Sequence, residues 1–84
     1  MSREHHLKTW PEHFMAIRSR LKTAEIRFDD RGFEVGDELF LDEWNPNTES
    51  YTGNVERRKV THILKEFIGL QLGYVMLSFD YEWL

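Results

Sequence analysis

The sequence predicts an α+β fold in which one helix near the N-terminus packs on a mainly antiparallel sheet. Apolar residues recur at helical spacing in one early segment, and the later apolar segments alternate in the manner of strands. The sequence shows no alternation of strand, helix and strand, which is the pattern that builds parallel sheets. Because a sheet of four or five strands curls readily, we expect a small, partly open β-barrel with the helix at its side.

Length and composition predict one domain, residues 1–84, with one hydrophobic core. A second core is not expected in a chain of 84 residues, because chains below roughly 100 residues bury a limited share of their surface. The sequence contains no Cys, which excludes disulfides and thiolate metal sites. Stability therefore has to come from packing, for which six Phe, three Trp and three Tyr supply large side chains.

Nothing in the sequence resembles a targeting signal or a membrane span. The opening Met-Ser-Arg-Glu-His-His is not followed by an apolar stretch, and no apolar run approaches the length that crosses a bilayer. Together with the missing Cys, these features predict a cytoplasmic protein without a membrane partner. The oligomeric state is left open.

The charges are distributed unevenly along the chain. The net charge of −4 argues against a basic coat that binds duplex DNA non-specifically. Residues 1–31, however, carry seven Lys and Arg against five Asp and Glu, whereas residues 32–84 carry four against ten. Any anion site is therefore expected in the first third of the chain.

The early helix is expected directly after a short edge strand at 4–8. Thr9 and Glu12 have the spacing of a capping box, and Pro11 stands in the first turn, where its missing N–H has little cost. A stripe at helical spacing should then face the core; it consists of Trp10, Phe14, Ile17 and Leu21.

The segment 23–28 alternates in the manner of a half-buried strand. We expect Ala24, Ile26 and Phe28 to face the core, with Ile26, Leu39, Leu77 and Phe79 among the neighbours of the helix stripe. The opposite, polar face then consists of Thr23, Glu25 and Arg27.

Turn chemistry separates the remaining strands. Turns are expected at 29–32 and 35–37, followed by a hairpin of 38–44 with 51–64, a loop at 67–73 and a last strand at 75–83. Gly53 marks a bulge or bend in the hairpin. The cations Arg57, Arg58 and Lys59 are expected on a solvated strand edge, although such a run can also contact a phosphate backbone.

The polar face of the second strand is the least ordinary feature of the sequence. Lys22, Glu25 and Arg27 fall within six residues of one another, and we place Lys22 at the strand entrance. Physical reasoning alone also accommodates a plain surface ladder of opposite charges, which contributes little to stability.

Four segments resemble the small bacterial and phage ASCH-like proteins, and more narrowly a DUF3850-type branch of the PUA-like superfamily. They are His6–Pro11, Lys22–Arg27, Asp30–Asp37 and Gly73–Ser78. The ASCH signature, Gly-x-Lys-x-x-Glu-x-Arg, maps onto Lys22, Glu25 and Arg27. Arg20 stands where the family usually has Gly, so a turn that requires positive φ is strained here.

This resemblance implies a PUA-like barrel with a cleft beside the helix that binds RNA, most of all single-stranded RNA, or nucleotides. In such a cleft Lys22 and Arg27 would contact phosphate, and Glu25 would accept a hydrogen bond from a base amine. Trp10 would stack on a base, although its place on the helix stripe favours the core more strongly. Lys8 and Arg31 are rim cations in this interpretation, or simply solvated.

The alternative function is that of a small amidohydrolase resembling the enzymes that act on acylated nucleosides such as N4-acetylcytidine. Lys22 would then be the base, with Glu25 and Thr23 beside it, although that enzyme branch usually has Thr at the position of Glu25. A protein-interaction domain that uses a strand edge is a third possibility. No cofactor is predicted, and no metal, because the four His lack a ligand pattern.

Overall fold

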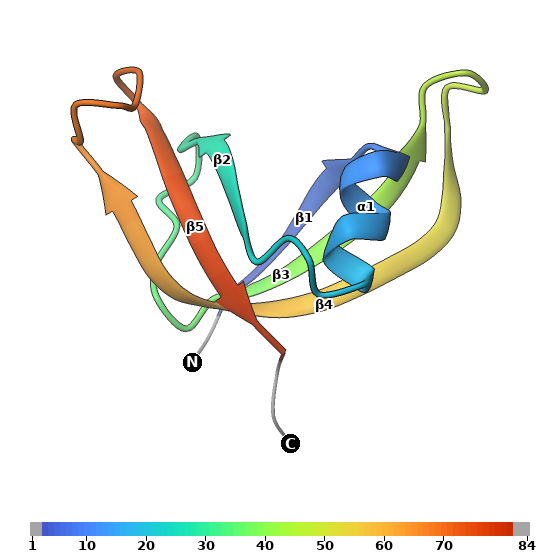
Figure 1. Cartoon of the computed structure of the whole chain (residues 1–84), viewed down its shortest axis with the longest axis horizontal. Coiled ribbons are helices and arrows are strands. Elements are labelled where there is room, and N and C mark those ends of the chain that lie inside the picture. The colour runs from blue at the N-terminus through green and yellow to red at the C-terminus, as the bar shows by residue number, and fades with distance from the viewer. Residues whose placement is uncertain (1–2, 82–84) are drawn as a thin grey trace.

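Five strands and one α-helix form within residues 3–81, the part of the chain that the computed structural model describes (Figure 1). In chain order the elements are β1 (Glu4–Thr9), α1 (Pro11–Arg18), β2 (Ala24–Phe28), β3 (Glu38–Asn45), β4 (Ser50–Lys65) and β5 (Tyr74–Asp80). The last expected strand is thus confirmed as far as Asp80, and its positions 82 and 83 lie outside the described residues. No described helix is long and apolar enough to cross a membrane.

The strands form one curled sheet in the order β1-β3-β4-β5-β2. The pairs β3–β4, β4–β5 and β5–β2 are antiparallel, whereas β1 runs parallel to β3. The sheet is therefore mixed, because the chain passes through α1 and β2 and returns to the starting end of β1 before β3 begins. In Figure 1 the sheet bends into two arms, with α1 lying against one arm and β2 along the other. This half-barrel confirms the expected partly open barrel.

The helix is shorter than its apolar stripe predicts. Phe14 and Ile17 are fully buried, but Trp10 is 49% exposed and Leu21 is 85% exposed. The expected capping box does not form within the described chain: the helix begins at Pro11 behind Trp10, and the Thr9 hydroxyl donates to the Leu7 carbonyl instead. Thr9 is still part of β1, which explains why it does not cap the helix.

The core lies between α1 and the concave face of the sheet. Ile17, Leu39, Leu77 and Phe79 belong to one buried cluster, as the sequence predicts. Phe33, from the loop before β3, covers the same cluster from another side. The cluster is completed by Leu7, Leu41, Val60 and Val75.

The orientation of β2 is the reverse of the predicted one. Ile26 and Phe28 are 58% and 54% exposed, whereas Glu25 is buried. Opposite Ile26 and Phe28 in β5 stand Met76 and Tyr74, so the apolar side of β2 joins an outer row of the sheet. Alternation revealed the two faces of this strand but not which face points inward.

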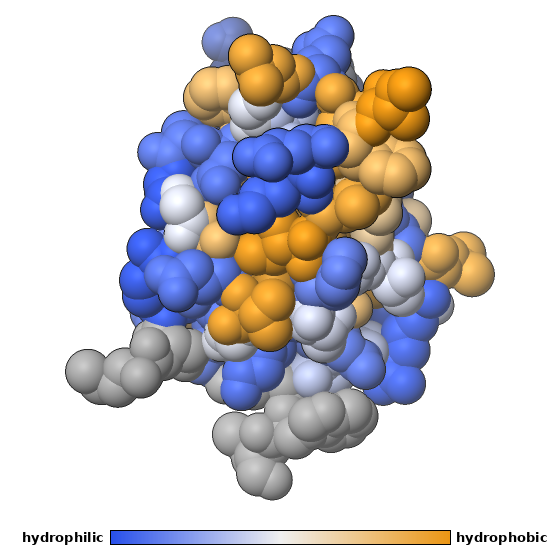
Figure 2. All heavy atoms as spheres, turned by 90° about the vertical axis from the view of Figure 1, so that its left-hand side faces the viewer, coloured by the Kyte–Doolittle hydropathy of each residue, from blue (hydrophilic) through white to orange (hydrophobic). Residues whose placement is uncertain are grey.

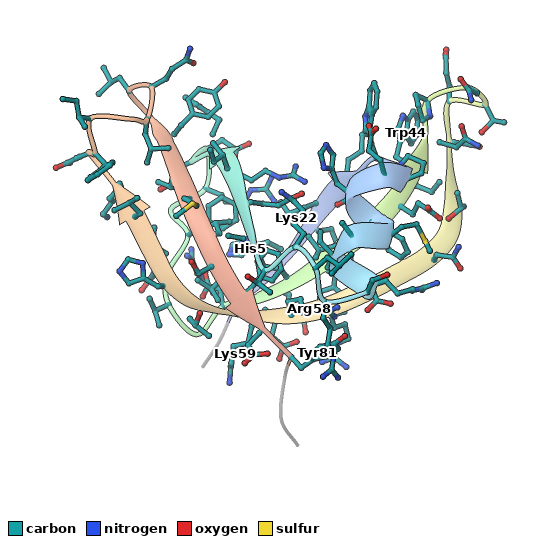
Figure 3. The ribbon with its side chains drawn as sticks, in the orientation of Figure 1. His5, Lys22, Trp44, Arg58, Lys59 and Tyr81 are labelled. Carbon is teal, nitrogen blue, oxygen red and sulfur yellow. The ribbon has the colours of Figure 1, made fainter. Side chains whose placement is uncertain are left out.

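Arg58 is a second departure from expectation, because its side chain is 4% exposed rather than solvated. The strand that carries it, β4, lies between β3 and β5 and is not an edge. The guanidinium donates to the Ile17 carbonyl at 2.9 Å and lies 3.8 Å from the ring centre of Tyr81. It therefore satisfies a carbonyl at the end of α1, and Figure 3 shows Arg58 and Tyr81 close together there.

The hairpin of β3 and β4 carries the expected irregularity at Gly53. The strand register shifts between Asp42 and Trp44, and Gly53 has φ +94°. Thr52 and Asn54, on either side of the glycine, donate to the carboxylate of Glu43 at 2.7 and 3.0 Å. These bonds from Asn54 and Thr52 lower the pKa of Glu43 below its ordinary value, against the opposing effect of burial.

Candidate functional site

A cleft of about 630 Å³ lies between the start of α1 and β2. It brings together five of the residues that the sequence singles out, which are Lys8, Trp10, Lys22, Glu25 and Arg27. Figure 3 shows Lys22 between β2 and α1, in the space between the two arms of the sheet. The cleft is therefore the candidate functional site.

The end of α1 places Lys22 at this position. The backbone N–H groups of Leu21 and Lys22 both donate to the Ala16 carbonyl, at 2.9 and 3.0 Å. Arg20 has φ +65°, a left-handed conformation that ends helices and usually selects Gly. Arg20 thus adopts a conformation that a glycine at this position would adopt without strain. Lys22 leaves the turn two residues before β2, at the strand entrance, as expected.

Glu25 and Arg27 form an ion pair on the inward face of β2. The Glu25 Oε2 atom accepts from Arg27 Nε at 2.9 Å and lies 2.8 Å from Arg27 Nη2. The Glu25 side chain is 8% exposed and that of Arg27 is 25% exposed. Such a pair holds both groups in one orientation, because the planar guanidinium presents its donors in a fixed geometry.

Arg27 also joins β2 to the opposite edge of the sheet. Its Nη2 donates to the Lys8 carbonyl in β1 at 2.9 Å. Arg31 makes a similar bond, of 3.3 Å, to the His6 carbonyl. Two arginine side chains, Arg27 in β2 and Arg31 in the loop that follows, therefore reach across to the edge strand β1, where a closed barrel would have a strand ladder. Arg27 is thus already bonded to Glu25 and to the Lys8 carbonyl, and its predicted contact with phosphate stays a prediction.

Lys22 is the cleft cation that remains available. Among the described residues, its ammonium group has no hydrogen-bonding or ion-pair partner. The Lys8 ammonium lies 4.0 Å from the ring centre of Trp44, at the outer end of the cleft. Lys22 is half-buried, so it is held beside the Glu25–Arg27 pair and still reaches solvent.

An aromatic wall that sequence reasoning missed borders the cleft. Phe28 and Tyr74 line it and contact each other edge to face, with ring centres 5.4 Å apart. His13 and Ile26 line it as well. Because β2 is an edge strand, the cleft extends around it and takes residues from both of its faces. The spacing of Trp10 and His13, three residues apart on one helix face, was the available signal for His13.

Two predicted site residues lie elsewhere. Arg31 does not line the cleft; it pairs with Asp30 at 2.9 Å, and this hydrogen bond lowers the pKa of Asp30. Thr23 borders a separate small hollow with Arg20 and Tyr81, and Lys22 lines both this hollow and the cleft. The structure therefore brings Lys22 and Glu25 into one cleft but leaves Thr23 outside its lining.

A second hollow of about 660 Å³ lies beside the loop at 66–73. Its walls include Ile68 and Leu72, which are 99% and 96% exposed, and its charged groups are Asp29, Lys65 and Glu66. Figure 2 shows this side of the molecule, with apolar side chains gathered from the loop at the top toward the middle of the face. Acidic groups outnumber the single lysine, so this hollow does not favour an anion.

Comparison with known proteins supplies a family for the chain. Residues 4–79 match the family model described as a domain of unknown function, DUF3850. The match includes every residue that lines the cleft. A search of curated protein sequences gave no match.

Proposed function

The chain belongs to the DUF3850 family, and we propose that its cleft binds RNA or nucleotides. The observation that carries this proposal is the unpaired Lys22 beside a fixed Glu25–Arg27 pair and an aromatic wall. We further propose that the half-barrel is an ASCH domain of the PUA-like superfamily, as its signature residues suggest.

Each feature of the cleft has a role in this binding mode. Lys22 supplies a mobile positive charge for a phosphate group. Trp10, 49% exposed, and Phe28, 54% exposed, offer ring surface on which an unpaired base can stack. Glu25 and Arg27 form a polar floor of fixed orientation. A ligand with one phosphate and one flat base matches this combination.

The alternative is the amidohydrolase that acts on acylated nucleosides, with Lys22, Thr23 and Glu25 as its catalytic group. The position of Thr23 in a separate hollow disfavours it, because a catalytic hydroxyl has to reach the bound substrate.

Substitution of Lys22 distinguishes the two functions. If the protein is a binding module, Lys22→Arg retains most of the affinity for short single-stranded RNA, whereas Lys22→Ala loses about tenfold, because charge alone is required. If the protein is a hydrolase, Lys22 has to lose its proton during turnover, which arginine cannot do. Affinity for RNA is measured by fluorescence anisotropy, and product release from N4-acetylcytidine is followed in parallel.

Lys59→Ala is the matched control, because Lys59 does not line the cleft and projects from the opposite side of the sheet in Figure 3. Turnover by the wild-type protein that disappears in Lys22→Arg would replace our proposal with the enzyme. Equal affinities for Lys22→Ala, Lys59→Ala and the wild type would remove the cleft as the binding site.

A further inference from the structure

We propose that Glu25 reads the base of the bound nucleotide and selects bases that carry an exocyclic amino group over uracil. The inference rests on the proposed nucleotide-binding function and adds a specificity to it. It follows from the different hydrogen bonding of the two oxygen atoms of the Glu25 carboxylate, which is nearly buried.

The two Glu25 oxygens have different surroundings. Oε2 accepts a hydrogen bond from Arg27 Nε at 2.9 Å and lies 2.8 Å from Arg27 Nη2. Oε1 has no partner among the described residues. The same part of the chain contains no fully buried side-chain oxygen or nitrogen that lacks a hydrogen bond. Oε1 is therefore not sealed in the core, and it reaches solvent on the side of the cleft that Glu25 lines.

A free carboxylate oxygen in a narrow cleft recognises hydrogen-bond donors only. An ionised carboxylate has no proton to donate, and its second oxygen, Oε2, already accepts from Arg27. The exocyclic amino group of cytosine or adenine supplies a suitable N–H donor. Uracil instead presents a carbonyl oxygen at the corresponding position, and its ring N–H is flanked by two carbonyl oxygens. These oxygens repel the carboxylate.

Arg27 also determines how the amide group of a glutamine at position 25 would be oriented. A guanidinium has five donors and no acceptor, so it binds the amide oxygen of the glutamine and excludes the amide nitrogen. The NH₂ group would then point into the cleft in place of Oε1. Glu25→Gln is therefore expected to convert an acceptor into a donor and to reverse the preference, instead of merely weakening binding.

The experiment measures the affinities of CMP and UMP, which differ at this position of the base, by isothermal titration calorimetry. The wild-type protein is expected to bind CMP about tenfold or more tightly than UMP, as for a charge-assisted hydrogen bond. Glu25→Gln is expected to bind UMP the more tightly of the two. Glu4→Gln, an exposed carboxylate outside the cleft, is the control and should keep the wild-type preference.

The outcomes separate this inference from the function on which it rests. Binding of CMP and UMP with equal affinity by the wild type overturns the base selection and leaves nucleotide binding intact. Binding of neither nucleotide, and of no short RNA, overturns both. The wild-type comparison decides the question even if Glu25→Gln fails to fold, which circular dichroism would show.

Discussion

At the scale of single residues, the carboxylate of Asp37 holds the start of β3 in place. Its Oδ2 atom accepts from His5 Nε2 at 2.8 Å, from Arg3 Nη2 at 3.0 Å and from the Glu34 N–H at 2.9 Å. Burial alone would raise the pKa of Asp37. The hydrogen bonds from His5, Glu34 and Arg3 together lower the pKa by more than burial raises it, so the pKa lies below its ordinary value. The ionised form therefore stabilises the fold.

We expect Asp37→Asn to lower stability at pH 7 by about 1 to 3 kcal/mol, because the amide presents an NH₂ group to some of the same donors. A depressed carboxyl pKa contributes stability above the unfolded value near 3.9, and this contribution is lost as the pH falls through the lower folded pKa. The difference in the free energy of unfolding between wild type and Asp37→Asn should thus shrink as the pH falls from about 5 to about 2.

Urea unfolding at several pH values measures this difference. Asp30→Asn is the control, because Asp30 is exposed and pairs with Arg31 on the surface, where ion pairs contribute little. A gap between wild type and Asp37→Asn that is constant down to pH 2 would contradict the role assigned to the ionised carboxylate.

The roles of several single residues could not be predicted from the sequence. The types and spacing of Lys22, Glu25 and Arg27 predicted correctly that these residues share one place in the fold. Their roles could not be predicted, because the partner of Arg27 is the Lys8 carbonyl, nineteen residues earlier in the chain. Arg58 shows the same limit: its burial depends on Ile17, forty-one residues away, and a run of three cations gives no sign of it.

At the scale of elements, α1 is anchored to the sheet by Phe14 and Ile17, both of which are fully buried. We expect Phe14→Ala to lower the free energy of unfolding by about 3 to 5 kcal/mol, because it leaves a cavity where an aromatic ring was packed. Met15→Ala is the matched control on the same helix, since Met15 is 51% exposed. Thermal unfolding of both variants by circular dichroism tests this, and equal midpoints would mean that Phe14 contributes no packing.

Element positions followed from local signals, whereas element orientations did not. Pro11 marked the start of α1 and the glycine at 36 the turn before β3, so the first residues of both elements were close to those expected. The orientation of β2 depended on its position at the sheet edge, where Arg27 reaches the Lys8 carbonyl of β1 across the open side of the barrel. The parallel pairing of β1 with β3 also depends on the path of the whole chain.

At the scale of the whole molecule, the charge distribution limits how a nucleic acid can bind. The net charge of −4 is offset locally by Lys22 and Lys8, the lysines that line the cleft. We expect log affinity for short single-stranded RNA to fall against log salt with a slope of about −1 to −2, as for contact with two phosphates. Anisotropy titrations from low to high salt measure the slope.

Lys22→Ala should make this slope shallower by about 0.7, the value for one phosphate contact on a single strand. Lys59→Ala should leave it unchanged. A slope several times steeper would indicate a larger basic surface outside the cleft, and a slope of zero would mean that phosphate is not recognised at all.

The arginine side chains between β1 and β2 have a consequence for motion. Strands joined by a backbone ladder separate only when several cooperative bonds break together, as in local unfolding. Here the two edges are held by Arg27 on the Lys8 carbonyl and Arg31 on the His6 carbonyl, and each bond can exchange for water through rotation of one side chain. Opening of this side therefore requires only the exchange of side-chain hydrogen bonds for water, while the hydrogen bonds of the five-stranded sheet stay intact.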